Sequence, residues 1–111
     1  MKVFISQPMR GRFDKEIEKD RRAALAFVQR QYPGDQIEEI DSFFKGAPTD
    51  AKPLWFLGKS LEAMADADVV VFCPGWADAR GCRVEHMAAT AYGVEILEYL
   101  PGYDVTVHVD F

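Results

Sequence analysis

The sequence has few of the residues that build metal centres or disulfide frameworks, with two cysteines and two histidines in 111 residues. This set is too small for a metal site, and we expect Cys73 and Cys82 to be reduced thiols. No run approaches the roughly 20 apolar residues that span a bilayer. The chain opens on the strand-like MKVFIS without a signal-peptide pattern, which predicts a cytoplasmic protein with no membrane contact.

Positive charge is also scarce, because 13 Lys and Arg face 18 Asp and Glu, for a formal net charge of -5. This balance argues against general affinity for duplex nucleic acid, which needs a field of cations. A small anionic ligand needs only a local cluster, and Arg10, Arg12, Arg80 and Arg83 are unevenly placed along the chain. With 49% hydrophobic and 28% charged residues, the composition predicts one globular domain over residues 1–111.

Strand-like and helical segments alternate along the chain. The expected strands are 2–6, 36–40, 69–73 and 94–98, and residues 105–109 are a candidate edge strand. The expected helices are 14–31, a second from Pro53 with Leu54, Leu57, Leu61 and Met64 at helical spacing, and a third from near Cys82 to Tyr92. This alternation predicts an α/β fold with a small, doubly wound parallel sheet.

The segment 41–52 is predicted to be an irregular loop with two adjacent exposed aromatics, Phe43 and Phe44. Exposure of both rings is costly unless something covers them. The loop therefore either folds over a ligand pocket or packs against a second subunit.

Two loops are predicted to flank the ligand crevice, which in open parallel sheets lies beyond the carboxyl ends of the strands. They are residues 7–12 after the first strand and 74–85 after the central one, and each enters a helix N-terminus that favours an anion. In the first loop, Arg10 and Gly11 suit a phosphate or a sugar. Alternatively, Gly11 only shapes the turn and Arg10 is a solvated charge.

Glu85 is the candidate catalytic residue, placed in about the first turn of the third helix, where its carboxylate can attack an anomeric carbon. The alternative is that it only complements the helix dipole. Trp76 either stacks on a nucleobase or caps the core. Asp78 either binds a sugar hydroxyl or protonates a leaving base, or it simply begins the turn.

Cys82 is a second candidate nucleophile, because its position at a helix N-terminus between Arg80 and Arg83 favours the thiolate. A general base is not visible beside it. His86 projects about 100° around the helix from Glu85, and His108 is expected in the last strand.

Three segments, FISQPMRG, GKSLEAMADADVVVF and GWADARGCRVEHMAATAYG, together resemble the nucleoside 2-deoxyribosyltransferase-like superfamily. The similarity spans roughly residues 2–97 and is strongest to a small bacterial and phage branch with the pattern GW-x-x-ARGC-x-x-E. It implies a Rossmann-like or flavodoxin-like three-layer sandwich, cleavage of an N-glycosidic bond, and no metal or organic cofactor. It also implies a homodimer or higher homo-oligomer in which a neighbouring subunit helps to close the site.

The resemblance assigns the catalytic glutamate to Glu85 and the first-loop phosphate contacts to Arg10 and Gly11. It also shows departures: Ser60 stands where many active members carry an aspartate that positions or protonates the base, and Gln7 stands where glycine is common. Arg80 and Arg83 make the helix entrance more positive, which favours a phosphorylated ligand. The residues expected to contact substrate are Gln7, Met9, Arg10, Gly11, Ser60, Trp76, Asp78, Arg80 and Gly81.

The leading hypothesis is therefore an enzyme that hydrolyses or transfers the glycosidic bond of a deoxyribonucleoside or its 5′-monophosphate. One alternative is a nucleotide-binding module without glycosidic chemistry, which the serine at position 60 favours. Another is a structural interaction domain with no ligand, in which Phe43 and Phe44 serve a protein interface.

Overall fold

The computed structural model describes residues 1–101 and shows the predicted α/β architecture. The strands are β1 (Lys2–Ser6), β2 (Glu38–Glu39), β3 (Val69–Phe72) and β4 (Glu95–Glu98). The helices are α1 (Asp14–Gln31), α2 (Pro53–Met64) and α3 (Arg80–Ala91), with a short 3₁₀ helix, η1 (Trp76–Asp78), before α3. The candidate strand 105–109 and His108 lie outside the described residues.

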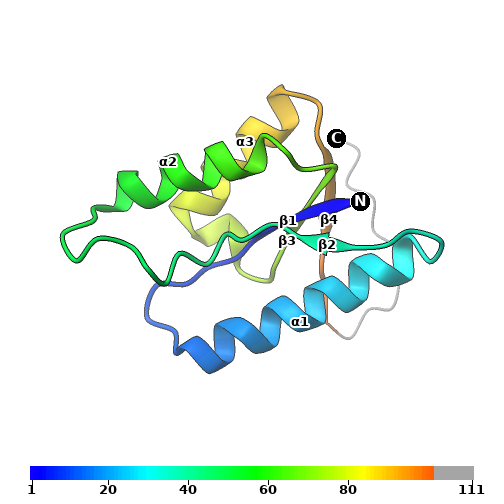
Figure 1. Cartoon of the computed structure of the whole chain (residues 1–111), viewed down its shortest axis with the longest axis horizontal. Helices are drawn as coiled ribbons and strands as arrows, with labels where there is room; N and C mark the ends of the chain where they lie inside the picture. Colours follow the sequence, from blue (N-terminus) through cyan, green and yellow to red (C-terminus); the bar gives the residue numbers. More distant parts are fainter. Residues whose placement is uncertain (102–111) are drawn as a thin grey trace.

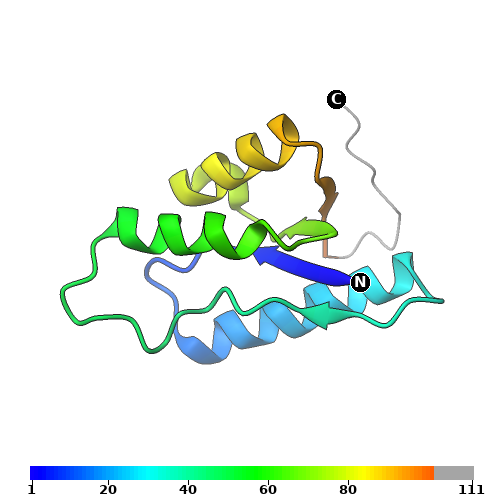
Figure 2. The same ribbon diagram turned by 45° about the horizontal axis from the view of Figure 1, so that its top comes forward.

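All strand pairs in the described part of the chain are parallel, and the strand order is β2-β1-β3-β4. Helix α1 covers one face of this sheet, and α2 and α3 cover the other (Figures 1 and 2). The chain therefore forms a three-layer sandwich of the Rossmann or flavodoxin type. No helix of residues 1–101 combines the length and apolar character needed to cross a bilayer.

The two faces of the sheet form two separate apolar layers. Val3, Ile5, Val69 and Val71 alternate with Phe4, Val70 and Phe72, because successive strand residues point to opposite faces. The first set packs against Ala24, Phe27 and Val28 of α1, and the second against Met64 of α2 and Ala89 of α3. Since β1 and β3 are buried on both faces, their carboxyl ends are held rigidly.

The second strand is shorter than expected, with only Glu38 and Glu39 paired to β1 instead of residues 36–40. Beyond Ile40 the ladder stops, and the Ser42 hydroxyl donates a hydrogen bond to the Ile5 carbonyl oxygen at 3.1 Å. A side chain therefore takes the place of the next backbone donor at this edge of the sheet.

Helix α3 begins at Arg80, two residues before the start near Cys82 that the sequence predicted. Gly75 has a φ of 85°, and its backbone turn leads directly into η1 and then an extended Ala79. This short connection moves the helix start toward η1. Glu85 consequently lies in the second turn of α3, and not in the first.

Two expectations about exposure are wrong. Leu54 is 78% exposed although it follows the helical spacing of α2, because the first turn of the helix extends past the sheet (Figure 1). Phe43 and Phe44 are half-buried: the Lys45 ammonium lies over the Phe43 ring, and Phe44 meets Trp55 edge-on at 6.3 Å. The chain itself covers part of both rings, and Phe43 also lines an open hollow next to α1.

Candidate functional site

The candidate site lies at the carboxyl ends of β1 and β3. From β1 the chain crosses by α1 to β2 on one side, whereas β3 lies on the other side, so the strand order reverses between β1 and β3. This switch point is where ligands bind in open α/β sheets. The loops after the two strands pack closely against each other here. A Cβ atom at Gly75 in the second loop would lie only 3.6 Å from the side chain of Pro8 in the first.

Glu85 points from α3 into this junction and is only 7% exposed. Ser6, the last residue of β1, donates a hydrogen bond from Oγ to Glu85 Oε1 at 2.8 Å. An acid that merely complements a helix dipole acts within the first turn and sits at the surface. Burial in the second turn, bound to the sheet, argues against that explanation for Glu85.

Burial raises the pKa of Glu85 to about 7, because the carboxylate loses hydration inside the protein. Hydrogen bonds from the Ser6 and Ser60 hydroxyls act in the opposite direction and lower it. The carboxyl group is thus poised between its two protonation states near neutral pH. Such a shift is typical of catalytic acids and bases, although buried structural groups also show it.

Ser60 belongs to α2, so three elements meet at the Glu85 carboxyl group: β1, α2 and α3. Sequence reasoning expected Ser60 to contact a substrate, and the structure places its hydroxyl on the glutamate. Ser6 was not singled out from the sequence. Its position as the last residue of a strand at the predicted crevice is the signal that could have identified it.

Cys82 does not have the predicted microenvironment. Its thiol is 4% exposed and lies beside Ser6, and burial raises its pKa to about 11. Arg80 and Arg83 are both exposed, so neither cation lowers the pKa of the thiol. Burial likewise raises the pKa of Cys73 to about 12. Both cysteines are free and buried, which argues against an activated thiolate at either position.

Trp76 packs within an aromatic cluster between η1 and α3, on the same face of the sheet as Glu85. Its indole stacks on the His86 imidazole, with centroids 4.3 Å apart and planes 7° from parallel, and it meets Phe72 at 5.2 Å. The ring remains half-buried. Trp76 therefore caps the core, and the exposed part of its indole is still available to a ligand.

The first loop presents Arg10 and Gly11 to solvent, and Gly11 adopts a φ of 74°. Met9 is half-buried, and its carbonyl oxygen accepts a hydrogen bond from the Arg12 backbone at 3.1 Å. The Arg12 guanidinium is engaged with Asp20 at 2.7 Å. For Arg10, by contrast, no ion pair occurs within residues 1–101.

The second loop contributes three further predicted residues. Asp78 is exposed on η1, Arg80 is exposed at the first position of α3, and Gly81 is half-buried behind it. None of the described contacts joins these residues to Glu85. The entrance to α3 therefore carries an accessible guanidinium at the same end of the sheet as Arg10.

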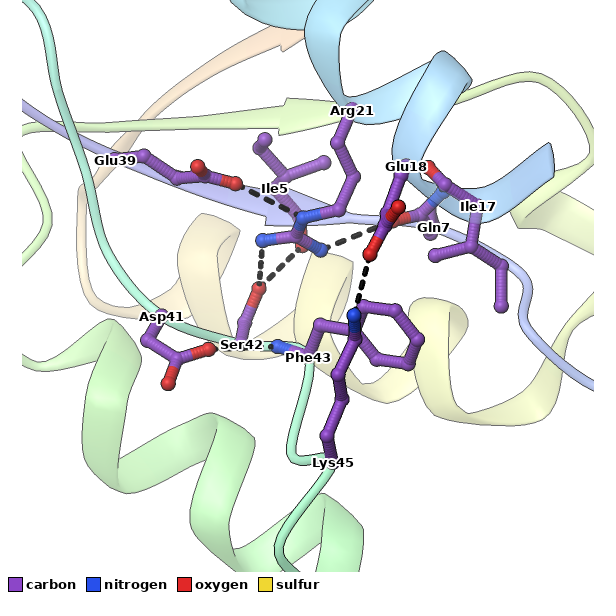
Figure 3. Close-up of polar contacts among 10 residues, drawn as sticks. All are labelled: Ile5, Gln7, Ile17, Glu18, Arg21, Glu39, Asp41, Ser42, Phe43 and Lys45. Atoms are coloured by element: carbon purple, nitrogen blue, oxygen red, sulfur yellow. Dashed lines mark hydrogen bonds and ion pairs between the residues drawn. The ribbon is translucent and has the colours of Figure 1, made fainter. Parts of the chain in front are cut away.

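Gln7, which the sequence predicted to contact substrate, lies inside a buried network around Arg21 (Figure 3). The Arg21 guanidinium donates to Gln7 Oε1, Ser42 Oγ and Glu39 Oε1, each at 2.9 Å. The Gln7 amide donates in turn to the Ile17 carbonyl oxygen at 3.1 Å. One guanidinium thus connects the first loop with β2 and the segment that follows it.

Sequence reasoning missed Arg21, although a signal was present. The residue follows Ile17 by four positions and precedes Ala24 by three, so it lies on the apolar face of α1. A charged residue on that face needs buried partners. An open hollow of about 550 Å³ borders this network, lined by α1, β2 and residues 41–46, and Glu85 is not among its lining residues.

Within the described part of the chain, no three His, Cys, Asp or Glu side chains are grouped so that they could hold a metal ion. Comparison of the sequence and fold with family models, curated proteins and solved structures gives no match.

Proposed function

We propose that this protein cleaves or transfers the N-glycosidic bond of a deoxyribonucleoside or its 5′-monophosphate, with Glu85 as the nucleophile. The observation that carries the proposal is a buried carboxylate at the switch point of a parallel sheet, held by Ser6. The resemblance of three sequence segments to the nucleoside 2-deoxyribosyltransferase-like superfamily supports the same reaction.

In the proposed first step, a carboxylate oxygen of Glu85 bonds to the anomeric carbon while the bond to the base breaks. The transition state has oxocarbenium character, which a nearby carboxylate stabilises electrostatically. Water or a second base then attacks the glycosyl ester and releases the glutamate. The Ser6 hydrogen bond fits this role, because it holds one carboxylate oxygen and so orients the other.

Arg10, the Gly11 backbone and Arg80 are the proposed contacts for phosphate or sugar oxygens. All three are exposed at the carboxyl end of the sheet, whereas Arg12 is already paired with Asp20. The exposed part of Trp76 is the proposed surface for the base.

The test is to incubate the protein with the common deoxynucleosides and their 5′-monophosphates and to measure free base by chromatography. Glu85→Gln should lower the rate roughly 10³-fold or more, the scale on which loss of one catalytic group acts. Base release that persists unchanged in this variant removes Glu85 from the mechanism. Tight calorimetric binding with intact nucleotide recovered afterwards favours a binding module instead.

We also propose that the protein acts in the cytoplasm as a homo-oligomer. The candidate contacts are Leu54 on α2 and Met87 on α3, exposed apolar side chains at 78% and 70% on two helices that cover the same face of the sheet. Light scattering should give a mass above that of one chain, and Met87→Lys should shift it toward the monomer. A native protein that is monomeric at micromolar concentration contradicts the assembly.

A further inference from the structure

Among the residues that the structure describes, no positively charged side chain contacts Glu85. Its carboxyl group meets the hydroxyls of Ser6 and Ser60, and the Cys82 thiol beside it is kept neutral by burial. Among residues 1–101, no lysine or arginine forms an ion pair with it. An ionised carboxylate that is buried without a counter-charge is costly. A ligand that brings positive charge to this point provides the counter-charge for the Glu85 carboxylate.

Within residues 1–101, no carboxylic acid other than Glu85 itself is in contact with its carboxyl group as a proton donor for a leaving base. Position 60 holds a serine, whose hydroxyl contacts the glutamate and is a poor general acid. Asp78 is exposed on η1, and no described contact joins it to Glu85. The His86 ring stacks on Trp76, and its Nε2 atom is buried without a hydrogen-bond partner among the described residues, so it does not face a ligand. A neutral nucleobase, which departs with difficulty unless it is protonated, is therefore a poor substrate.

Trp76 adds an independent feature on the same side of the junction. It is stacked on His86, the residue that follows Glu85 in α3, so the indole packs against the same turn of the helix. The half-buried indole has part of its surface free. An indole face attracts cations, and the attraction strengthens where water is excluded.

We propose that this site takes N-glycosides whose base already carries a positive charge, such as nucleotides of an N7-alkylated purine. The inference rests on the proposed function, and it names the class of leaving group. The base would lie between the free surface of Trp76 and the Glu85 carboxylate, while Arg10 and Arg80 face the phosphate.

The chemistry balances without a general acid. A carboxylate oxygen of Glu85 forms a bond to the anomeric carbon as the carbon–nitrogen bond breaks. The electron pair of that bond returns to the base and neutralises its positive charge, so no proton is transferred to it. Water then cleaves the glycosyl ester, which yields the free sugar and the Glu85 carboxylate, and one proton passes to solvent.

The experiment compares 7-methyl-2′-deoxyguanosine 5′-monophosphate with 2′-deoxyguanosine 5′-monophosphate, which share sugar and phosphate. Base release above the spontaneous rate is measured by chromatography for each. The methylated nucleotide should be cleaved with a kcat/KM at least about 100-fold higher, because protonation by a general acid is worth about that much to the neutral base. Equal rates, or faster cleavage of the unmethylated nucleotide, overturn the inference and leave the proposed function standing. Absence of cleavage of both, and of every nucleoside tested, overturns the proposed function as well.

A pair of variants tests the reason for the preference. Ser60→Ala and Ser60→Asp both remove the hydroxyl, but only the second brings an acid to α2. Relative to Ser60→Ala, Ser60→Asp should cleave the unmethylated nucleotide about tenfold faster and the methylated one no faster. Circular dichroism confirms that both variants are folded. If a folded Ser60→Asp protein cleaves both nucleotides faster than Ser60→Ala by the same factor, the missing-acid explanation is contradicted.

Discussion

Ser6 and Glu85 are 79 positions apart in the chain, yet the Ser6 hydroxyl donates to the Glu85 carboxylate at 2.8 Å. Ser6 is 1% exposed at the end of β1, and Glu85 is 7% exposed on α3. The bond therefore links the centre of the sheet to the helix that covers it. It also stabilises the ionised carboxylate, so it affects both the position and the protonation of the group.

Ser6→Ala should raise the pKa of Glu85 above its value of about 7, because a donor to the ionised form is lost. The midpoint of the pH–activity profile should rise by about one pH unit, since hydrogen bonds to charged groups are worth about 1.5–3 kcal/mol. Ser42→Ala is the matched control, because it removes another buried hydroxyl that does not touch Glu85. Equal shifts in the two variants would show that the effect is not local.

Activity of the native protein should rise with pH through about 7 and then level off. The proposed nucleophile is the ionised carboxylate of Glu85, and burial raises the pKa at which it ionises. The kcat/KM for base release should increase about tenfold between pH 6 and pH 8. A profile that falls over this interval would mean that the protonated carboxyl is the active form.

The raised pKa of Glu85 also has a consequence for stability. The group has a folded-state pKa of about 7 against 4.5 for the ordinary carboxyl, so its stabilising contribution is complete below pH 4.5 and is lost as pH rises through about 7. Glu85→Gln avoids this loss. Its stability relative to the native protein should increase from pH 4 to pH 8 by on the order of 3 kcal/mol, measured by urea unfolding. A pH-independent difference argues that the carboxyl is not buried in solution.

Arg21→Met should destabilise the protein by about 2–4 kcal/mol, because Gln7 and Ser42 lose their buried donor and Glu39 loses its ion pair. Arg22→Met is the control, since the neighbouring residue of α1 is exposed and should change stability by less than about 0.5 kcal/mol. Urea unfolding followed by circular dichroism measures both. Similar values for the two variants contradict the structural role of the Arg21 network.

The native protein should react slowly with thiol reagents at pH 8. Cys73 and Cys82 are 1% and 4% exposed, and burial raises the pKa of each thiol to about 11 or 12. Two thiols per chain should react rapidly only after denaturation, as followed by the absorbance of released thionitrobenzoate. Fast modification of one thiol in the folded protein would restore Cys82 as a candidate nucleophile.

Arg10→Gln should lower the preference for a 5′-monophosphate over the nucleoside by about tenfold, the effect of losing one charge-assisted hydrogen bond. Arg12→Gln should have a smaller effect, because Asp20 and Glu16 already occupy that guanidinium. The ratio of kcat/KM values for the two substrates measures both effects. A larger loss in Arg12→Gln would reverse this assignment.

The course of the chain was largely predictable from local patterns. The apolar run Val69–Phe72 predicted a strand covered on both faces, and the acid-rich start and later Pro33 predicted the limits of α1. Glu85 was also a candidate from its position and from the resemblance of three sequence segments to the nucleoside 2-deoxyribosyltransferase-like superfamily. Each of these signals is local, since hydrophobic periodicity and turn residues act within a few positions of the chain.

The sequence by itself determined the layered fold and the end of the sheet at which a site belongs. Only the tertiary structure decided which groups meet there. Ser6 and Ser60 bind Glu85, Gln7 accepts a hydrogen bond from Arg21, and Cys82 is a buried thiol with a raised pKa. The physical reason is that burial and hydrogen bonding depend on contacts between distant segments. They depend on the register of β1 against β3 and on the starting residue of α3, and no local pattern encodes either one.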